Sequence, residues 1–291
     1  MSWSLSAFAD EAGPSTDEQI KALKAAGYNF IDLRNVDGFN ITMLPLDKAK
    51  DVRAKLDAAG ITVGMYGSPI GKIDITEDFN IDVEKLKHLG ALRPILGATN
   101  VRLFSYYNKA NKPKTEFAKV ALDRLRELAK IGKDLGLVLY HENESHIFGD
   151  RCEDVLTIAN TVRGDAFKMI FDFGNYNAGG ENALENWKKL KPLTDAIHLK
   201  DNVRNADGKL HHVPAGQGGG FIKEILADAA KSGWTGPLTL EPHLTHSAAV
   251  MATGPSGVAN QAYAAMTPAE SFAIAAKTAK DLIASVGGKV N

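Results

Sequence analysis

Four segments of the chain each end an apolar run on a side chain that can bind a metal ion. The side chains at these four ends are Glu142, Asp172, His198 and Glu241. Three carboxylates and one imidazole form an oxygen-rich ligand set that suits Mn²⁺, Co²⁺, Mg²⁺ or Zn²⁺ and leaves positions open for water or substrate. Carboxylates held close together repel one another unless a cation neutralises them. The sequence therefore predicts one divalent metal ion bound by these four residues.

Each of these residues also has an ordinary structural explanation. A carboxylate at the end of a strand is often the N-cap of the next helix, and a single strand histidine is more often a hydrogen-bonded core residue. Four in succession, each ending an apolar run, favour the metal site. Glu144 lies two residues beyond Glu142 and points to the same side of a strand, but Glu142 is closer to the apolar run and is the predicted ligand.

Such an ion can bind adjacent carbonyl and hydroxyl oxygens of a polyol and act as a Lewis acid on the carbonyl. The neighbouring C–H becomes more acidic, and the positive charge stabilises the enediolate that forms when the proton leaves. With a base on one face and an acid on the other, these steps isomerise or epimerise the substrate. The site thus favours a sugar or a sugar derivative as the bound small molecule.

Further polar side chains follow the four predicted ligands or lie in nearby loops. Lysine and arginine just past His198 suit the recognition of hydroxyl or phosphate groups. Several histidines (His146, His211, His212, His243 and His246) could carry protons near neutral pH, although a solvated loop residue is the commoner explanation for each. The predicted substrate contacts are Glu144, His146, Lys200, Arg204, Lys72 and His243.

The elements that position these residues alternate regularly along the chain. Apolar runs predict strands at 4–9, 29–34, 61–66, 100–104, 136–140, 166–172, 195–199 and 237–241. Helical periodicity and end signals predict helices at 15–27, 46–59, 83–96, 115–135, 151–161, 181–190, 221–232 and 268–285. This order predicts an α/β fold, a (β/α)8 TIM barrel whose strand ends converge on one face. With no linker or shift in composition, we predict one domain over residues 1–291.

Composition narrows the function classes. The 291 residues are 44% hydrophobic with a formal net charge of −1, so the chain can bury a large core and has no overall basic charge for nucleic acid. The single cysteine, Cys152, excludes a disulfide framework and a thiolate metal site. The start lacks a signal-peptide pattern, and no run reaches the length of a membrane span. We expect a cytoplasmic protein that binds neither nucleic acid nor membrane and that could form a homo-oligomer.

Two loops in the second half of the chain could also contribute to function. Residues 242–267 form a longer gap between elements than compact domains usually contain, which is typical of a lid, a partner contact or a disordered segment. Residues 216–220 read Gly-Gln-Gly-Gly-Gly before a predicted helix. Their backbone N–H groups could bind an anion, although the spacing matches no regular phosphate loop.

The motifs around the predicted ligands resemble those of the xylose isomerase-like barrel superfamily, which contains sugar phosphate isomerases and epimerases. The matching motifs are His141–Glu144 with Gly149–Asp150, Phe171–Asn175, Ile197–Asp201 and Leu240–Pro242. The resemblance extends over essentially the whole chain and implies a TIM barrel. In ketose 3-epimerases of this superfamily a Glu-Asp-His-Glu set binds one divalent metal, and that set falls on the four residues predicted above.

The resemblance also implies roles for individual residues. The first and last metal glutamates of those epimerases act as acid and base, which implies these roles for Glu142 and Glu241. An arginine six residues after the metal histidine contacts substrate there, and Arg204 occupies that position. Two other contact positions differ, because Asn175 replaces a histidine and Phe148 replaces a glutamate. The metal set fits the family, whereas ketohexose specificity is not implied.

Three alternatives to a sugar isomerase or epimerase remain. Deglycosidases of the same superfamily use proton abstraction for elimination and cleave 3-keto-glycosides. An endonuclease IV-like enzyme would need three metal ions, more histidine ligands and a basic DNA face, which the net charge of −1 and the oxygen-rich set count against. A sugar-binding or structural barrel without activity is the last alternative, and the intact ligand set argues against it.

Overall fold

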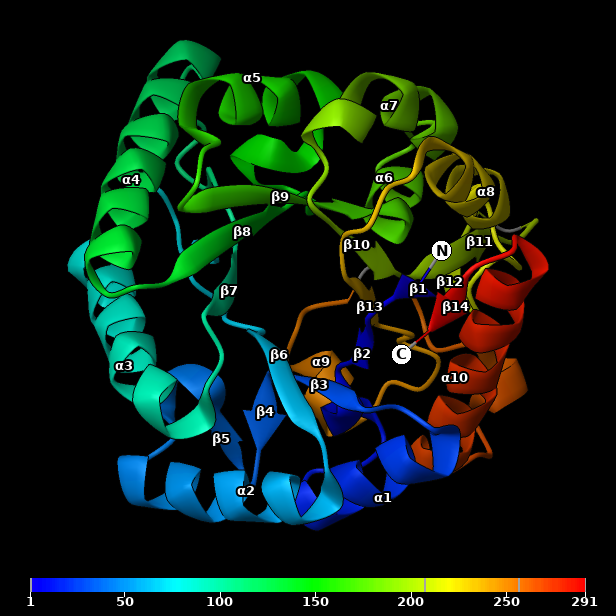
Figure 1. The fold of residues 1–291 in the computed structure, drawn as a ribbon. Helices are drawn as coiled ribbons and strands as arrows, with labels where there is room; N and C mark the ends of the chain where they lie inside the picture. Colours follow the sequence, from blue (N-terminus) through cyan, green and yellow to red (C-terminus); the bar gives the residue numbers. More distant parts are fainter. Residues whose placement is uncertain (1, 207, 256, 291) are drawn as a thin grey trace.

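The computed structural model describes residues 2–206, 208–255 and 257–290. Within these residues, eight parallel strands form a nearly closed barrel in the order β2, β13, β10, β9, β8, β7, β6, β3, and helices surround it (Figure 1). The strands are β2 (Leu5–Ala7), β3 (Phe30–Leu33), β6 (Thr62–Tyr66), β7 (Asn100–Leu103), β8 (Val138–Glu142), β9 (Phe167–Asp172), β10 (Ala196–Leu199) and β13 (Leu238–Leu240). The predicted TIM barrel is confirmed.

The α-helices are α1 (Thr16–Ala26), α2 (Leu46–Ala59), α3 (Asn80–Leu96), α4 (Lys114–Asp134), α5 (Cys152–Val162), α6 (Phe173–Ala178), α7 (Ala183–Leu190), α8 (Ile222–Ser232), α9 (Ala248–Met251) and α10 (Pro268–Ser285). Eight of these helices correspond to the predicted ones, and the short helices α6 and α9 are additional. Local signals set several ends: Ser15 and Glu18 form a capping box at the start of α1, and Gly27 ends it in the left-handed conformation. None of the described helices is both long and apolar enough to cross a bilayer.

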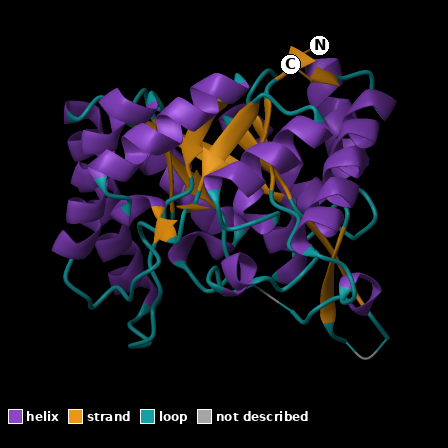
Figure 2. Ribbon diagram, turned by 90° about the horizontal axis from the view of Figure 1, so that it is seen from below, coloured by secondary structure: helices purple, strands orange, loops and turns teal. Residues whose placement is uncertain are grey.

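Several short elements depart from the regular alternation. Two antiparallel hairpins follow β3 and β10, namely β4 (Asn35–Val36) with β5 (Phe39–Asn40) and β11 (Asp201–Arg204) with β12 (Leu210–Val213). The terminal strands β1 (Ser2–Trp3) and β14 (Lys289–Val290) pair at the opposite end of the barrel (Figure 2). Short 3-10 helices are η1 (Ala9–Glu11), η2 (Ile41–Met43), η3 (Phe148–Asp150), η4 (Lys191–Leu193) and η5 (Gln261–Tyr263).

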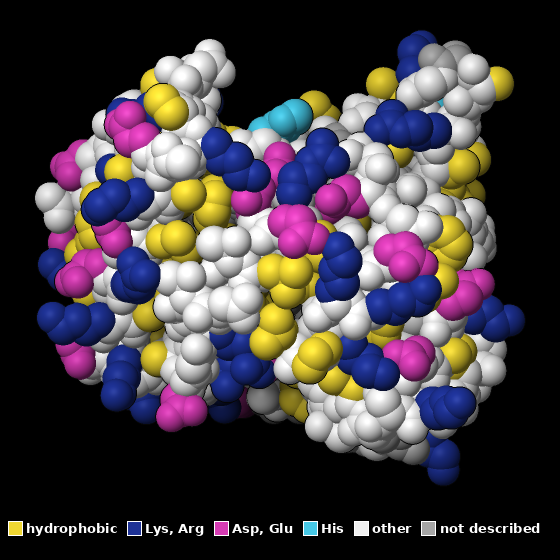
Figure 3. Space-filling model, turned by 90° about the horizontal axis from the view of Figure 1, so that it is seen from above, with side chains coloured by type: hydrophobic (Ala, Val, Ile, Leu, Met, Phe, Trp, Pro, Cys, Tyr) yellow, Lys and Arg dark blue, Asp and Glu magenta, His cyan; other side chains and the backbone are white. Residues whose placement is uncertain are grey.

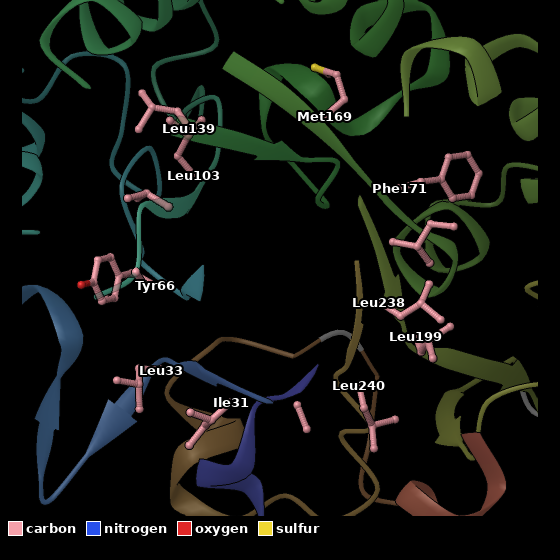
Figure 4. Close-up of a cluster of buried hydrophobic side chains, with 14 of the residues drawn as sticks. Ile31, Leu33, Tyr66, Leu103, Leu139, Met169, Phe171, Leu199, Leu238 and Leu240 are labelled. Atoms are coloured by element: carbon pink, nitrogen blue, oxygen red, sulfur yellow. The ribbon is translucent and has the colours of Figure 1, made fainter. Parts of the chain in front are cut away.

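The barrel strands alternate between side chains that face the helices and side chains that face the interior. Figure 4 shows the first set, including Leu139, Phe171, Leu199 and Leu240, which point away from the barrel axis and are buried. Residues one or three positions further along a strand therefore face inward. A small apolar cluster of Met65, Ile170 and Ala196 fills the middle of the interior, and polar residues lie at both of its ends.

The outer surface mixes charges of both signs. On the face shown in Figure 3, lysine and arginine side chains alternate with aspartate and glutamate, and no continuous basic area lies on that face. Its upper edge is hollowed between two raised parts, and a histidine lies in the hollow. This edge is the end of the barrel that carries the β11–β12 hairpin.

Candidate metal centre

The four predicted ligands meet at the C-terminal end of the barrel. Glu142 and Asp172 are the last residues of β8 and β9, His198 lies in β10, and Glu241 directly follows β13. One ligand atom from each lies within 4.8 Å of those of the others, and all four residues are buried. Parallel strands bring their C-terminal ends to one face of a barrel, so residues far apart in the sequence share this place.

The His198 ring faces the carboxylates through Nδ1, which lies 3.0 Å from Glu142 Oε1 and 3.5 Å from Glu241 Oε2. Burial opposes protonation of the ring, but the charge of Glu142 and hydrogen bonds with both glutamates outweigh it and raise the pKa of His198 to about 9. Nε2 has no hydrogen-bond partner among the described residues. Nδ1 is therefore the candidate ligand atom of this histidine.

Two buried arginines contact the glutamates of the cluster. Arg34 follows β3, and its Nη1 lies 2.8 Å from Glu241 Oε1. Arg102 lies in β7, and its Nη1 is 3.2 Å from Glu142 Oε2 and 3.5 Å from Glu241 Oε1. Burial alone would raise the pKa of Glu142, but the charges of His198 and Arg102 lower it to about 2. Glu142 is therefore ionised at neutral pH.

Lys200 supplies a third buried cation. Its Nζ lies 3.3 Å from Glu241 Oε2 and 3.2 Å from Asp172 Oδ2. The contact with Asp172 lacks hydrogen-bond geometry, and Oδ2 has no other donor among the described residues. Asp172 Oδ1 accepts a 2.7 Å hydrogen bond from Asn175 N and caps α6. Asp172 is thus a helix cap through one oxygen and keeps the other for a ligand.

The ion pairs of this network link five carboxylates to three permanent cations, so two negative charges remain to be balanced. In the metal-free chain two protons can balance them, because the pKa of His198 is raised to about 9 and burial raises the pKa of Asp172 well above its usual value. The carboxylates are Asp10, Glu11, Glu142, Asp172 and Glu241, and the cations are Arg34, Arg102 and Lys200. A divalent ion balances this excess when a neutral histidine binds it. The excess charge and the free Asp172 oxygen both fit a divalent metal ion.

A second group of acidic and imidazole side chains, Glu11, Glu241 and His243, lies beside the first. His243 N donates a 2.7 Å hydrogen bond to Glu11 Oε2, and His243 Nδ1 lies 2.8 Å from Glu11 Oε1. Arg34 contacts both glutamates, so its guanidinium supplies the positive charge that a metal ion would bring. The His243 backbone has a φ of 49°, a left-handed conformation that is uncommon for a residue other than glycine.

A small, partly open cavity of about 20 Å³ borders the cluster. Glu241 and Lys200 form part of its wall, and so do Lys72 and Glu144. Lys72 Nζ donates hydrogen bonds of 2.9 Å to Glu144 Oε2 and 3.3 Å to the Thr253 carbonyl oxygen. Residues 253–255 complete the wall. Part of the long 242–267 segment therefore covers this cavity.

The predicted substrate contacts divide into two sets. Lys72, Glu144, Lys200 and His243 all line the cavity beside the candidate ligands. His146 is exposed and is not part of the cavity wall. Arg204 is also exposed, and its guanidinium donates hydrogen bonds to the carbonyl oxygens of Ala178 and Gly208. The structure does not bring these last two residues to the cavity.

The structure also places the two positions that differ from the family pattern, Asn175 and Phe148, and the glycine-rich loop 216–220. Asn175 lines the cavity, whereas Phe148 is buried edge-on against Phe117, with 5.6 Å between ring centroids. The glycine-rich loop serves a residue of the chain itself, because the N–H groups of three of its four glycines, at 216, 218 and 220, all donate to the Asp201 carboxylate. These donors are therefore occupied by an internal anion.

Fold and site together define a class of protein, a (β/α)8 barrel with a buried carboxylate–histidine cluster at the C-terminal ends of four adjacent strands. The model of the xylose isomerase-like TIM barrel family matches residues 20–263 of the chain. The chain belongs to this family.

Solved structures share the fold at low sequence identity. The IOLI protein with a bound zinc atom has a TM-score of 0.75 and 18% identity over 97% of this chain and 99% of that chain. D-Psicose 3-epimerase crystallised with D-fructose has a TM-score of 0.71 and 14% identity over 98% and 100% of the two chains. The probable 3-DHS dehydratase of Bacillus anthracis has a TM-score of 0.67 and 17% identity over 86% and 95%. No curated protein matches the sequence.

Proposed function

We propose that the chain is a divalent-metal-dependent enzyme that isomerises or epimerises a sugar or a sugar derivative. The observation that carries the proposal is the buried cluster of four candidate ligands, whose ion-pair network has two fewer permanent positive charges than carboxylates, beside a small cavity. Membership of the xylose isomerase-like family supports it. Glu142, Asp172, His198 and Glu241 would hold the ion. When bound, the ion supplies Lewis acidity toward the substrate carbonyl.

The side chains of the site carry the proton transfers. Glu241 lines the cavity, and although burial raises its pKa, Lys200 and other positive groups hold that pKa well below its usual range. An ionised carboxylate in this place can accept the proton from the carbon next to the carbonyl. Glu142, which is ionised at neutral pH, can return a proton from the other side only after it has taken one up. Lys200 and Lys72 orient hydroxyl or phosphate oxygens. Residues 253–255 limit the access of water.

Hydrogen–deuterium exchange tests proton abstraction directly, because the exchanged proton is detected in the substrate itself and the product need not be identified. The chain, loaded with Mn²⁺, Co²⁺, Mg²⁺ or Zn²⁺, is incubated in D₂O with free ketoses, ketose phosphates and 3-keto-glycosides. NMR then detects deuterium at the carbon next to the carbonyl. We expect exchange with one of these classes and a loss of about 100-fold or more in Glu241→Gln, the usual range for removal of a general base.

A surface variant provides the control for this experiment. Glu185 pairs with Lys188 on the outside of α7, and both side chains are largely exposed. Glu185→Gln should exchange substrate at the wild-type rate. Full exchange by Glu241→Gln at wild-type metal content would refute the role of Glu241, and a wild-type chain that binds no metal would refute the proposal as a whole.

A second candidate function is elimination from a keto sugar, as in a 3-keto-glycoside deglycosidase. The observation that favours it is the Lys72–Glu144 pair in the cavity wall, because it provides a proton donor for a leaving group. The same experiment separates the two functions, since elimination releases an aglycone or water and epimerisation releases nothing.

A cytoplasmic location, a single domain and a homo-oligomer stay predictions.

A further inference from the structure

The barrel interior contains a second cavity at its N-terminal end, opposite the candidate metal centre. It has a volume of about 270 Å³, and its wall includes Ser6, Asp32, Asn100, Tyr140 and Thr239. The interior of a TIM barrel is normally filled by layers of bulky apolar side chains. A polar cavity here therefore calls for an explanation.

Asp32 is the charged residue of this wall, and the chain holds it in a defined position. It lies in β3 with 3% of its surface exposed. Thr239 Oγ1 donates a 2.7 Å hydrogen bond to Asp32 Oδ2. Gly64 leaves space on the other side, since a Cβ there would lie 2.7 Å from Asp32 Oδ1. The hydroxyls of Thr239 and Ser6 both contribute hydrogen bonds to the carboxylate, which also borders the cavity and can accept a further donor there.

The strand register places this carboxylate close to His198. Thr239 in β13 is the register partner of His198 in β10, so both side chains enter the barrel at the same height. Burial raises the pKa of Asp32, and of the charged groups that lower it His198 acts most strongly, followed by Arg102. Asp32 and His198 thus interact across the interior.

His198 has one ring nitrogen that no described residue satisfies. Nδ1 faces Glu142 and Glu241, whereas Nε2 is buried without a hydrogen-bond partner. A histidine that binds a metal through one nitrogen almost always donates its other N–H to a carboxylate, a carbonyl or a water molecule. Phe8 stands edge-on to the ring at 5.5 Å between centroids and has no acceptor to offer.

We propose that Asp32 is a positioning residue for His198. A water molecule in the N-terminal cavity accepts a hydrogen bond from His198 Nε2–H and donates one to the Asp32 carboxylate. A proton fixed on Nε2 leaves the Nδ1 lone pair free for the metal and holds the ring in one orientation. The cavity has room for this water, and the hydroxyls of Ser6 and Thr239 offer it further partners. The inference rests on the proposed metal site, but it concerns metal affinity and not the reaction.

The test is the affinity of the full chain for Zn²⁺, measured by competition with a chromophoric chelator. Asp32→Asn keeps the shape of the side chain and an acceptor for Thr239, but it is a weaker acceptor toward His198. Its zinc dissociation constant should rise about 10- to 100-fold, as for other outer partners of metal ligands. Tyr140→Phe is the matched control, because it lines the same cavity and loses only a hydroxyl. Its dissociation constant should equal that of the wild type.

NMR of zinc-loaded, ¹⁵N-histidine-labelled chain gives a second readout. The wild type should show His198 protonated on Nε2, and this proton should exchange with water faster in Asp32→Asn. Stability gives a third, because burial raises the pKa of Asp32 to about 6 and its ionised form disfavours folding at neutral pH. A merely structural defect would lower stability, whereas we expect Asp32→Asn to be more stable and to bind zinc more weakly.

The outcomes are distinguishable from those of the proposed function. Unchanged zinc affinity in Asp32→Asn overturns this inference and leaves the proposed function standing. A wild-type chain that binds zinc but exchanges no substrate proton overturns only the proposed function, and one that binds no zinc overturns both. If Asp32→Asn does not fold, Thr239→Val, which removes the anchor of Asp32, must weaken zinc binding for the inference to survive.

Discussion

The two ends of the barrel interior are built from the same eight strands but hold buried charge in opposite ways. At the C-terminal end, five carboxylates meet three permanent cations, which leaves two negative charges to be balanced by protons on His198 and Asp172 or by a divalent ion. At the N-terminal end, Asp32 is surrounded by hydroxyl and amide groups. Buried charge is costly unless it is paired. The C-terminal end, where several carboxylates converge, can therefore hold a divalent cation, whereas the N-terminal end holds the single carboxylate of Asp32, whose pKa is raised by burial.

The largest expected effect comes from removing one charge at the C-terminal end. Asp172→Asn preserves a helix cap, because asparagine caps helices about as well as aspartate, but it removes a charged ligand. Four-ligand zinc sites bind with about 10–16 kcal/mol, so one ligand is worth about 3–4 kcal/mol, or roughly 100- to 1000-fold in dissociation constant. Chelator competition measures this loss, and circular dichroism checks that the fold is retained. Wild-type affinity in Asp172→Asn would mean that Asp172 serves only as a cap.

A smaller effect should appear at the N-terminal end, in the pH dependence of stability. The pKa of Asp32 is raised from 3.8 to about 6 in the folded chain. The folded state then binds the proton more tightly than the unfolded state, so the contribution of Asp32 is most favourable below pH 3.8 and is lost as the pH rises through 6. The loss amounts to about 3 kcal/mol at most.

Urea unfolding of the metal-free wild type and of Asp32→Asn between pH 4 and pH 8 measures this difference. The two chains should be similarly stable at pH 4, and Asp32→Asn should become the more stable one as the pH rises. Subtracting the variant removes the shared titration of the C-terminal network. A difference that stays constant over this range would show that Asp32 keeps its ordinary pKa and that the two ends do not differ in this respect.

The sequence predicted the candidate ligands of the C-terminal end because each of them ends an apolar run. Strand alternation then decides which side chains face inward, and parallel strands bring their ends together. Local patterns are therefore enough to select Glu142, Asp172, His198 and Glu241 as candidate ligands. The barrel itself follows from the alternation of strands and helices. These predictions rest on periodicity, which is a local property of the chain.

The rest of the site depends on contacts between distant residues. Arg34 directly follows β3 and Arg102 lies in β7, and a buried arginine at such a place is a signal, but their partner Glu241 lies far along the chain at the end of β13. Arg204 follows His198 at the family spacing, yet the β11–β12 hairpin takes it away from the cavity. Spacing along the chain does not report such pairings, because loop geometry and partner choice are decided in three dimensions.

The smallest expected effect tests whether Lys200 compensates the excess charge of the C-terminal end. Its Nζ lies within 3.3 Å of oxygens of two candidate ligands, so a metal ion and the ammonium group compete for the same negative charge. Lys200→Met should therefore tighten metal binding by about tenfold, or about 1.4 kcal/mol, while the metal-free form unfolds more easily because its carboxylates lose a partner. Lys188→Met, on the exposed surface pair with Glu185, is the control and should change neither property. Weaker metal binding in Lys200→Met would mean that the lysine helps to assemble the ligands instead of competing with the ion, and the contrast between the two ends would then rest on ligand geometry more than on charge.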